Sequence, residues 1–203
     1  MGHTFFAYQY GMVDVERVVQ RVLDFLEKED MIRRQDKLLI ATQFGERVSM
    51  LYIDPLSAVV IRDGIKSIAT GGPTALSLLH LICHTPDMRL LYLRQNDYSD
   101  IELFYLDHGD ELLTHIPDSH REPEKFEVLL AELKTAQMVQ MWMDEVREDD
   151  IHEQFGVGAG DIRRTADTAE WLLYAAHELA SLFKARLALT PLRKLHERVR
   201  HGV

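Results

Sequence analysis

Two side chains suited to stacking on flat rings lie seven residues apart in the last quarter of the sequence. Arg164 carries a planar cation and Trp171 a large aromatic ring. The sequence predicts one long helix over residues 161–186, and at about 100° per residue the two side chains fall within roughly 20° of each other on one face. A guanidinium group and an indole ring can each stack against an unpaired nucleic-acid base. The spacing therefore indicates a candidate contact for a single strand.

The other positions of this helix predict how it is held. The opposite face is a stripe of small apolar residues, which can pack closely on neighbouring helices. Thr168 and Ala175 lie beside Arg164 and Trp171 and are small enough to let a ligand approach. The alternative is that Trp171 packs against another helix while Arg164 pairs with an acid, and spacing alone leaves both open. The small-residue stripe consists of Ile162, Ala166, Ala169, Leu173, Ala176 and Ala180.

Charge is distributed unevenly along the chain. Residues 161–203 carry eight Lys and Arg against five acids, whereas the whole sequence has a formal net charge of −10. The overall charge argues against an indiscriminate nucleic-acid coat protein. The basic C-terminal region could still meet a polyanion at one place, although a helix pair with solvated charges is the alternative interpretation.

Other apparent motifs for nucleotide chemistry are incomplete. The glycine run at 156–160 lacks the rest of a dinucleotide fingerprint, and we interpret it as a flexible approach to a helix capped by Asp161. Asp144 and Glu145 resemble the acidic motif of NTPases, but the chain contains no GxxxxGK[ST] loop to hold phosphates. We therefore expect no catalytic residue and no cofactor site in this chain, and no ATPase activity from it alone.

A cluster of potential metal ligands is also incomplete. His80, Cys83 and His84 share one predicted helix, but no fourth ligand is spaced to complete a zinc site. A packed cysteine with flanking histidines is the favoured interpretation, and no metal site is expected. Trp142 lies among methionines, which favours core packing for it.

Hydrophobic periodicity and turn residues predict a mainly α chain in two domains. Residues 1–72 combine a helix at 13–29, two short strands around a turn at 34–36, and helices that follow Thr42 and Asp54-Pro55. A helix followed by a small hairpin and another helix is typical of a winged helix. After the break at Gly71-Gly72-Pro73, residues 73–203 predict a helical bundle. Its expected helices are 74–84, 97–113, 124–148, 161–186 and 191–200.

Sequence features that bear on location are few. No apolar run approaches the roughly 18 residues of a membrane helix, and the N-terminus does not resemble a signal peptide. The single cysteine, Cys83, excludes an intrachain disulfide and fits a reducing compartment. We expect a cytoplasmic protein without a membrane partner.

Several separate motifs resemble one family, the archaeal Hjm helicases. These are superfamily 2 DNA helicases related to the animal HELQ protein. The stretch from Phe155 to Arg164, followed by Thr168-Ala169-Glu170-Trp171-Leu172, resembles the ratchet helix of that family, apart from Ala159, where the family usually has proline. The remaining similar segments occur in the family's order. They are Thr4-Phe5-Phe6, Ala41-Thr42 with Gly45, and Leu51 to Pro55 for the winged helix, Leu81 to Met88 for the start of the ratchet domain, and Arg198 to Val203 for its end.

The resemblance implies a partial winged helix followed by a ratchet domain. By this resemblance Arg164 and Trp171 occupy the positions that stack on bases, and Arg163 and Thr168 are further nucleic-acid-binding candidates. The whole enzyme would be an ATP-dependent helicase that moves 3′ to 5′ on single-stranded DNA during repair or fork restart. Its RecA-like motor domains, which would hold ATP and Mg²⁺, are not in this sequence, so we expect a piece of a longer helicase. Expected partners are single-stranded or forked DNA, those motor domains, and repair or single-strand-binding proteins.

Two other function classes remain open from the sequence. One is a winged-helix transcription regulator that binds duplex DNA, but the helix at 13–29 presents five acids against three basic residues. A helix that reads a DNA groove is expected to have a positive face. The other is a protein-interaction module that uses the acidic residues of 87–160 and has no nucleic-acid role.

Overall fold

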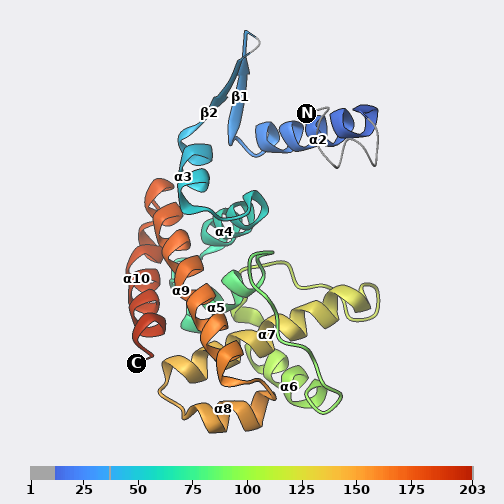
Figure 1. Cartoon of the computed structure of the whole chain (residues 1–203). Helices are drawn as coiled ribbons and strands as arrows, with labels where there is room; N and C mark the ends of the chain where they lie inside the picture. Colours follow the sequence, from blue (N-terminus) through green and yellow to red (C-terminus); the bar gives the residue numbers. More distant parts are fainter. Residues whose placement is uncertain (1–11, 37, 203) are drawn as a thin grey trace. The chain divides into compact units, whose positions relative to one another are not determined.

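The chain is mainly helical with one small hairpin, as the sequence predicts (Figure 1). This computed structural model describes residues 12–36 and 38–202, so the Thr4-Phe5-Phe6 motif lies outside the described residues. The chain separates into two compact units, residues 1–55 and 56–203. The division into domains at residues 72 and 73 stays a prediction.

The first unit is built around an antiparallel hairpin. Helix α2 (Met12–Lys28) precedes strands β1 (Ile32–Gln35) and β2 (Leu38–Ala41), and α3 (Gln43–Leu51) follows. The register pairs the first residue of β1 with the last of β2. Two acids of α2 bind one arginine of β1 and so tie the hairpin to the helix. The contacts are Arg34 to Asp24 at 2.7 Å and Arg34 to Glu27 at 3.1 Å.

Thr42 joins the hairpin to α3 through its hydroxyl group. The hydroxyl oxygen accepts a hydrogen bond from the Gly45 amide at 3.1 Å, which confirms the predicted N-cap. The same hydroxyl donates to the carbonyl of Asp30 at 2.6 Å. Gly45 is required here because a Cβ at this position would collide with the carbonyl of Met31. That carbonyl already accepts the Thr42 amide at 3.0 Å and so cannot easily move.

The second unit is a helical bundle. Helices α9 and α10 run side by side along one edge in Figure 1, with α5 and α7 packed behind α9. The centre of the bundle is filled by fully buried aliphatic side chains such as Leu79, Leu133, Met138 and Leu172. The elements in chain order are α4 (Pro55–Ser67), α5 (Ala75–Cys83), α6 (Tyr98–His108), the 3₁₀ turn η1 (Gly109–Glu111), α7 (Pro123–Met143), α8 (Glu148–Phe155), α9 (Ala159–Leu182) and α10 (Arg186–His201).

Several predicted helix boundaries in this unit are wrong, including the end of α9, which lies at Leu182 and not at residue 186. The helix expected over 124–148 ends at Met143, because Glu145 adopts a left-handed backbone (φ 58°), and the separate α8 follows. Three acids in the first turn of α8 suit the positive end of a helix dipole. The helix expected over 97–113 gives way to η1 after His108. Helix α10 starts at Arg186, five residues before the expected start at Pro191, which lies inside the helix and lacks the amide proton for a backbone hydrogen bond.

A buried ion pair joins the segment before α6 to α7. The Lys134 ammonium group is almost fully buried and donates to the Asp97 carboxylate at 2.6 Å and to the Tyr92 carbonyl at 2.7 Å. Arg94 binds the same carboxylate through its guanidinium group, at 2.8 Å, and through its backbone amide, at 2.7 Å. Burial would raise the pKa of Asp97, but hydrogen bonds from Arg94 and Lys134 outweigh it and hold this pKa well below the usual range. The pair therefore holds the non-helical segment at 90–97 against α7.

We predict that Lys134→Met destabilises the chain by roughly 3–5 kcal/mol, because it leaves a buried carboxylate with one partner fewer. The pKa of Asp97 is lower in the folded chain than its ordinary value of 3.8. The ionised Asp97 carboxylate therefore stabilises the fold above pH 3.8, and this stabilisation is lost as the pH falls below that value. Lys134→Met should therefore also reduce the loss of stability between about pH 4 and pH 2. Urea unfolding at a series of pH values measures both effects.

The matched control is Lys125→Met, since Lys125 lies on the same helix with a largely exposed side chain. The prediction fails if the two variants lose similar stability or share the wild-type acid dependence.

We also predict that Gly45→Ala destabilises the first unit by about 1–3 kcal/mol, because the added methyl group collides with a fixed backbone carbonyl. Gly160→Ala is the control, as a Cβ there would meet open space. Thermal unfolding of both variants by circular dichroism tests this. Equal melting temperatures would show that the hairpin can shift to admit the methyl group.

Candidate nucleic-acid interface

Helix α9 begins two residues earlier than the sequence predicts. Gly158 is the N-cap residue, and its carbonyl accepts the amides of Asp161 and Ile162 at 2.9 and 3.0 Å. Asp161 therefore lies in the first turn and is not the cap. An acid in a first turn still interacts favourably with the helix dipole.

The small-residue stripe of α9 is buried, as expected. Ile162, Ala169, Ala176 and Ala180 are all fully buried. Ala175 is fully buried as well, so the expectation that it leaves room for a ligand is wrong. At about 100° per residue Ala175 lies only some 40° from Trp171, so the neighbouring helices cover the edge of the face that a helical wheel suggests is open.

The exposed side of α9 forms a narrow strip, which we call the α9 strip. It comprises Arg164, Asp167, Trp171, Tyr174 and Glu178. Arg164 and Asp167 are exposed, Trp171 and Glu178 are half-buried, and Tyr174 is 47% exposed. Trp171 is therefore partly packed and partly accessible. This state lies between the two alternatives drawn from the sequence, a surface residue that stacks on a base and a residue packed against another helix.

Arg164 and Thr168 make contacts within their own helix. The Arg164 guanidinium group pairs with the Asp161 carboxylate, one turn earlier, and both side chains are more than half exposed. The Thr168 hydroxyl donates to the Arg164 carbonyl at 2.9 Å. This pairing agrees with the alternative stated above, in which Arg164 pairs with an acid. Because exposed ion pairs are weak, an incoming ligand can displace it.

Arg163 is directed to a different neighbour. Its guanidinium group lies over the ring of Trp142 on α7, 5.3 Å from the ring centroid. The Trp142 indole N–H donates to the carbonyl of Val199 on α10 at 3.0 Å, and the ring is half-buried. Trp142 thus links α7, α9 and α10 rather than lying in the innermost core. The structure brings Arg164, Thr168 and Trp171 onto one side of α9 but places Arg163 against Trp142.

The basic residues predicted for the C-terminal region lie mainly on α10. Arg186, Arg193 and Lys194 are exposed there. Arg198 pairs with Asp144 at 2.8 Å, and Arg200 lies 3.6 Å from Glu170 of α9. The outer face of α10 therefore carries positive charge beside α9, which suits a phosphate backbone.

Tyr174 is a candidate that our reasoning from the sequence missed. It follows Trp171 by three residues on the α9 strip, and its ring lies 6.0 Å from that of His196 on α10. The aromatic spacing of three residues was the available signal. On the helical wheel Tyr174 lies about 80° from Arg164, at the edge of the face that Arg164 and Trp171 share.

The histidine and cysteine cluster of α5 is a helix-packing feature. Cys83 is buried, and burial raises the pKa of its thiol. His80 and His84 both face Glu132 of α7, at 3.1 and 2.8 Å. No group of three or more His, Cys, Asp and Glu able to hold a metal ion occurs within residues 12–36 and 38–202. None of the described helices is both long and apolar enough to cross a membrane.

Comparison with known proteins assigns the bundle to a family. Residues 76–202, which run from the second residue of α5 to the end of α10, match the family described as "Archaeal helicase, domain 4". The chain belongs to this family. This match confirms the coarser part of the resemblance drawn from the sequence, that to an archaeal helicase.

Two relatives match over the whole chain. It is 42% identical to the ATP-dependent DNA helicase Hel308 of Methanocella arvoryzae and 35% identical to the protein of the same name from Thermococcus kodakarensis. Both alignments cover 100% of this chain but only 27% and 18% of the two relatives. The chain therefore spans a minor part of the length of these archaeal helicases.

Proposed function

We propose that this chain is the DNA-engaging accessory part of an ATP-dependent 3′–5′ DNA helicase of the Hjm/HELQ type in superfamily 2. In this proposal residues 1–72 form a partial winged-helix domain and residues 73–203 a ratchet domain, with α9 as the ratchet helix. The observation that carries the proposal is the position of Arg164 and Trp171 on the α9 strip of an archaeal helicase domain 4. Both relatives are ATP-dependent DNA helicases by name, which supports the proposed helicase activity.

The α9 strip can hold a single strand by stacking. One base stacks on the accessible part of Trp171, and the Arg164 guanidinium group takes a second base or a phosphate after leaving Asp161. Base–aromatic stacking contributes about 1–3 kcal/mol per base and tolerates any sequence, as a translocating enzyme requires. Thr168 and Arg163 are secondary candidates, because the first is bonded to its own helix and the second lies on Trp142.

The remaining functions belong to the longer protein. Its RecA-like motor domains would bind ATP and Mg²⁺ and move the strand along α9. Single-stranded or forked DNA is the proposed substrate, with repair or fork restart as its role and repair or single-strand-binding proteins as further partners. We place the enzyme in the cytoplasm.

We predict that Trp171→Ala and Arg164→Ala each weaken binding of a fluorescent oligothymidine about five- to tenfold in low salt, since one stacking contact is lost. Arg164→Ala should also reduce the salt dependence if the guanidinium group contacts phosphate. Fluorescence anisotropy at several salt concentrations measures both changes, with circular dichroism to verify folding.

Tyr92→Ala and Arg89→Ala are the matched controls, because both residues are exposed in the same unit and lie outside α9. If Trp171→Ala lowers the melting temperature strongly but leaves affinity unchanged, Trp171 belongs to the core and the assignment is wrong. Tighter binding to a blunt duplex than to oligothymidine would instead favour a duplex-binding regulator.

We further predict that Asp161→Asn strengthens oligothymidine binding about two- to fivefold, because the Asp161 carboxylate no longer competes with DNA for the Arg164 guanidinium group. Asp167→Asn is the control, since it removes the same charge from the same helix. The same anisotropy assay distinguishes them. A weaker affinity in Asp161→Asn would mean that Asp161 holds Arg164 in its binding orientation.

A further inference from the structure

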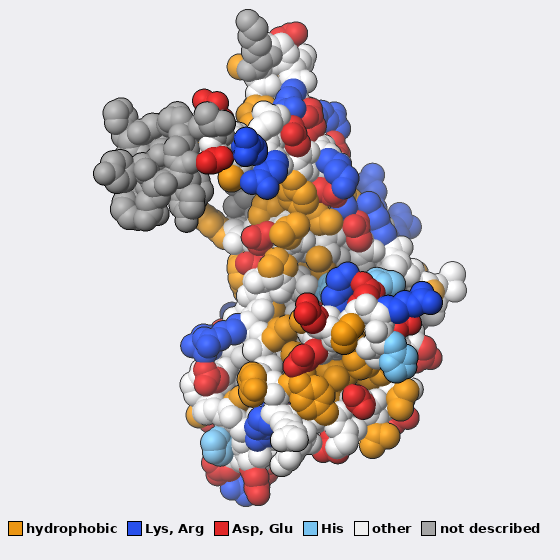
Figure 2. Space-filling view, turned by 90° about the vertical axis from the view of Figure 1, so that its right-hand side faces the viewer, with side chains coloured by type: hydrophobic (Ala, Val, Ile, Leu, Met, Phe, Trp, Pro, Cys, Tyr) orange, Lys and Arg blue, Asp and Glu red, His pale blue; other side chains and the backbone are white. Residues whose placement is uncertain are grey.

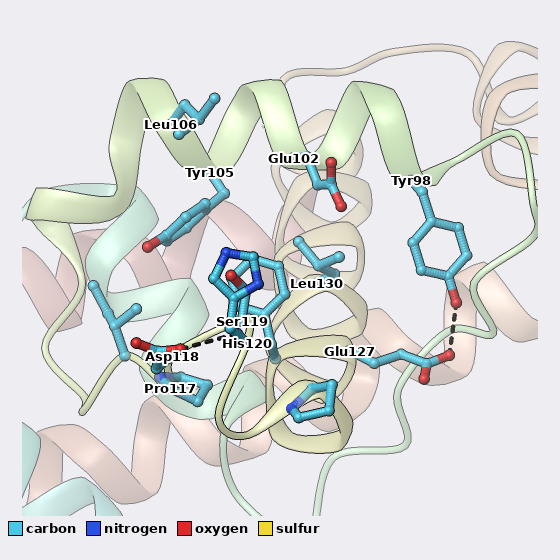
Figure 3. Close-up of a pocket in the computed structure, with 13 residues that line it drawn as sticks. Tyr98, Glu102, Tyr105, Leu106, Pro117, Asp118, Ser119, His120, Glu127 and Leu130 are labelled. Atoms are coloured by element: carbon cyan, nitrogen blue, oxygen red, sulfur yellow. Dashed lines mark hydrogen bonds between the residues drawn. The ribbon is translucent and has the colours of Figure 1, made fainter.

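A second surface of the helical unit has no part in the proposed DNA contact. It is a groove of about 850 Å³ between α6, α7 and the turn at 116–120, which we call the α6–α7 groove. Figure 3 shows Tyr98, Glu102 and Tyr105 on α6 facing Glu127 and Leu130 on α7, with the turn closing one side. Such a volume is sufficient for a few large side chains of a ligand.

The floor of the groove is apolar and well supported. Leu130 is almost fully buried and belongs to a cluster with Leu93, Ile101, Leu129 and Leu133. Above it the rings of Tyr105 and Phe126 meet edge to face, with centroids 5.4 Å apart. Because the floor is part of a packed core, the groove is a preformed feature of the fold.

The upper edge of the groove exposes an aliphatic side chain. Leu106 lines the groove from α6 and is 73% exposed to solvent. In Figure 2, the part of the second unit on the side of α6 and α7 has exposed hydrophobic side chains bordered by acidic side chains and histidines. An exposed apolar area with a polar border is characteristic of a protein-interaction site.

The rim of the groove is acidic. Residues 98–127 contain nine acidic and two basic residues, and three of the acids, Glu102, Asp118 and Glu127, line the groove. Backbone amides of Arg121 and His120 donate to Asp118, each at 2.9 Å, and lower the pKa of its carboxyl group, so it stays ionised. Glu127 accepts the Tyr98 hydroxyl at 2.6 Å. Among the described residues Glu102 has no ion-pair partner.

We propose that the α6–α7 groove binds a short segment of a partner protein that carries an aliphatic or aromatic anchor flanked by lysine or arginine. The anchor inserts between Tyr105 and Leu106 and contacts Leu130. The flanking cations bind the carboxylates of Glu102 and Asp118. Charge complementarity selects this occupant, because a nucleic-acid backbone would be repelled by the same carboxylates. The proposal is independent of the DNA contact on α9.

The test uses the 203-residue chain and a phage-displayed library of random 12-residue peptides, followed by synthesis of the enriched sequences. We expect enriched peptides to be positively charged and to contain a large apolar residue. Titration calorimetry should show about tenfold weaker binding to Leu106→Glu, which places a charge in the apolar wall. Glu102→Gln should weaken binding about three- to fivefold and reduce its salt dependence.

Matched controls lie on the same helix. Leu103→Glu changes an exposed leucine outside the groove, and Asp107→Asn removes an exposed acid outside it, so neither should change peptide affinity. If no enriched peptide depends on Leu106, or if the enriched peptides are acidic, the proposal is wrong.

Two further outcomes would assign the groove to another occupant and overturn the proposal. One is oligothymidine binding that is lost in Leu106→Glu but retained in Trp171→Ala. The other is concentration-dependent dimerisation, seen by sedimentation, that Leu106→Glu abolishes. We expect Leu106→Glu to leave oligothymidine affinity unchanged. The peptide assay then tests the groove alone, and the oligothymidine assay tests the α9 proposal alone.

Discussion

Helix α9 is held in the bundle by a face of small side chains packed closely against its neighbours. Alanines at 166, 169, 176 and 180 are buried on this face, and larger residues there would push α9 away from the helices that pack on it. This close packing determines which side chains remain accessible. The α9 strip is narrow because α5, α7, α8 and α10 all contact this one helix.

The same packing explains why the two side chains of the candidate DNA contact are partly held by the fold. Trp171 lies at the edge of the buried face, so part of its ring is fixed by the bundle and part is accessible. Arg164 lies further out, and its guanidinium group pairs with the exposed Asp161 carboxylate. A fixed aromatic ring loses little entropy on stacking, and a weak ion pair is readily exchanged. Both properties would suit the reversible base stacking that we propose for the α9 strip.

Polar interactions give the bundle its second distinct surface. The Lys134–Asp97 pair and the Arg94 bonds hold the segment before α6 on α7. Helix α6 is thereby fixed along α7, and the α6–α7 groove lies between them. The acidic rim of the groove and the basic face of α10 are segregated on different elements. The unit therefore keeps the surface proposed for a polyanion apart from the surface proposed for a basic peptide.

The sequence by itself determined the features that depend on local chemistry. Helical periodicity located most helices, the Thr42 cap and the turn near Asp36 placed the hairpin, and the spacing of Arg164 and Trp171 placed both on one side of α9. These features rest on backbone hydrogen bonds and steric preferences within a few residues. The composition also located the basic region that α10 presents.

Only the tertiary structure decided which of those faces are covered. The burial of Ala175, the stacking of Arg163 on Trp142 and the pairing of Lys134 with Asp97 all join elements far apart in the sequence. The break before α8 likewise depends on the left-handed backbone conformation of Glu145. Glutamate is not a residue type that predicts this conformation from the sequence. Whether a side chain is exposed is set by what other helices place over it, and a periodic pattern along one helix carries no information about those neighbours.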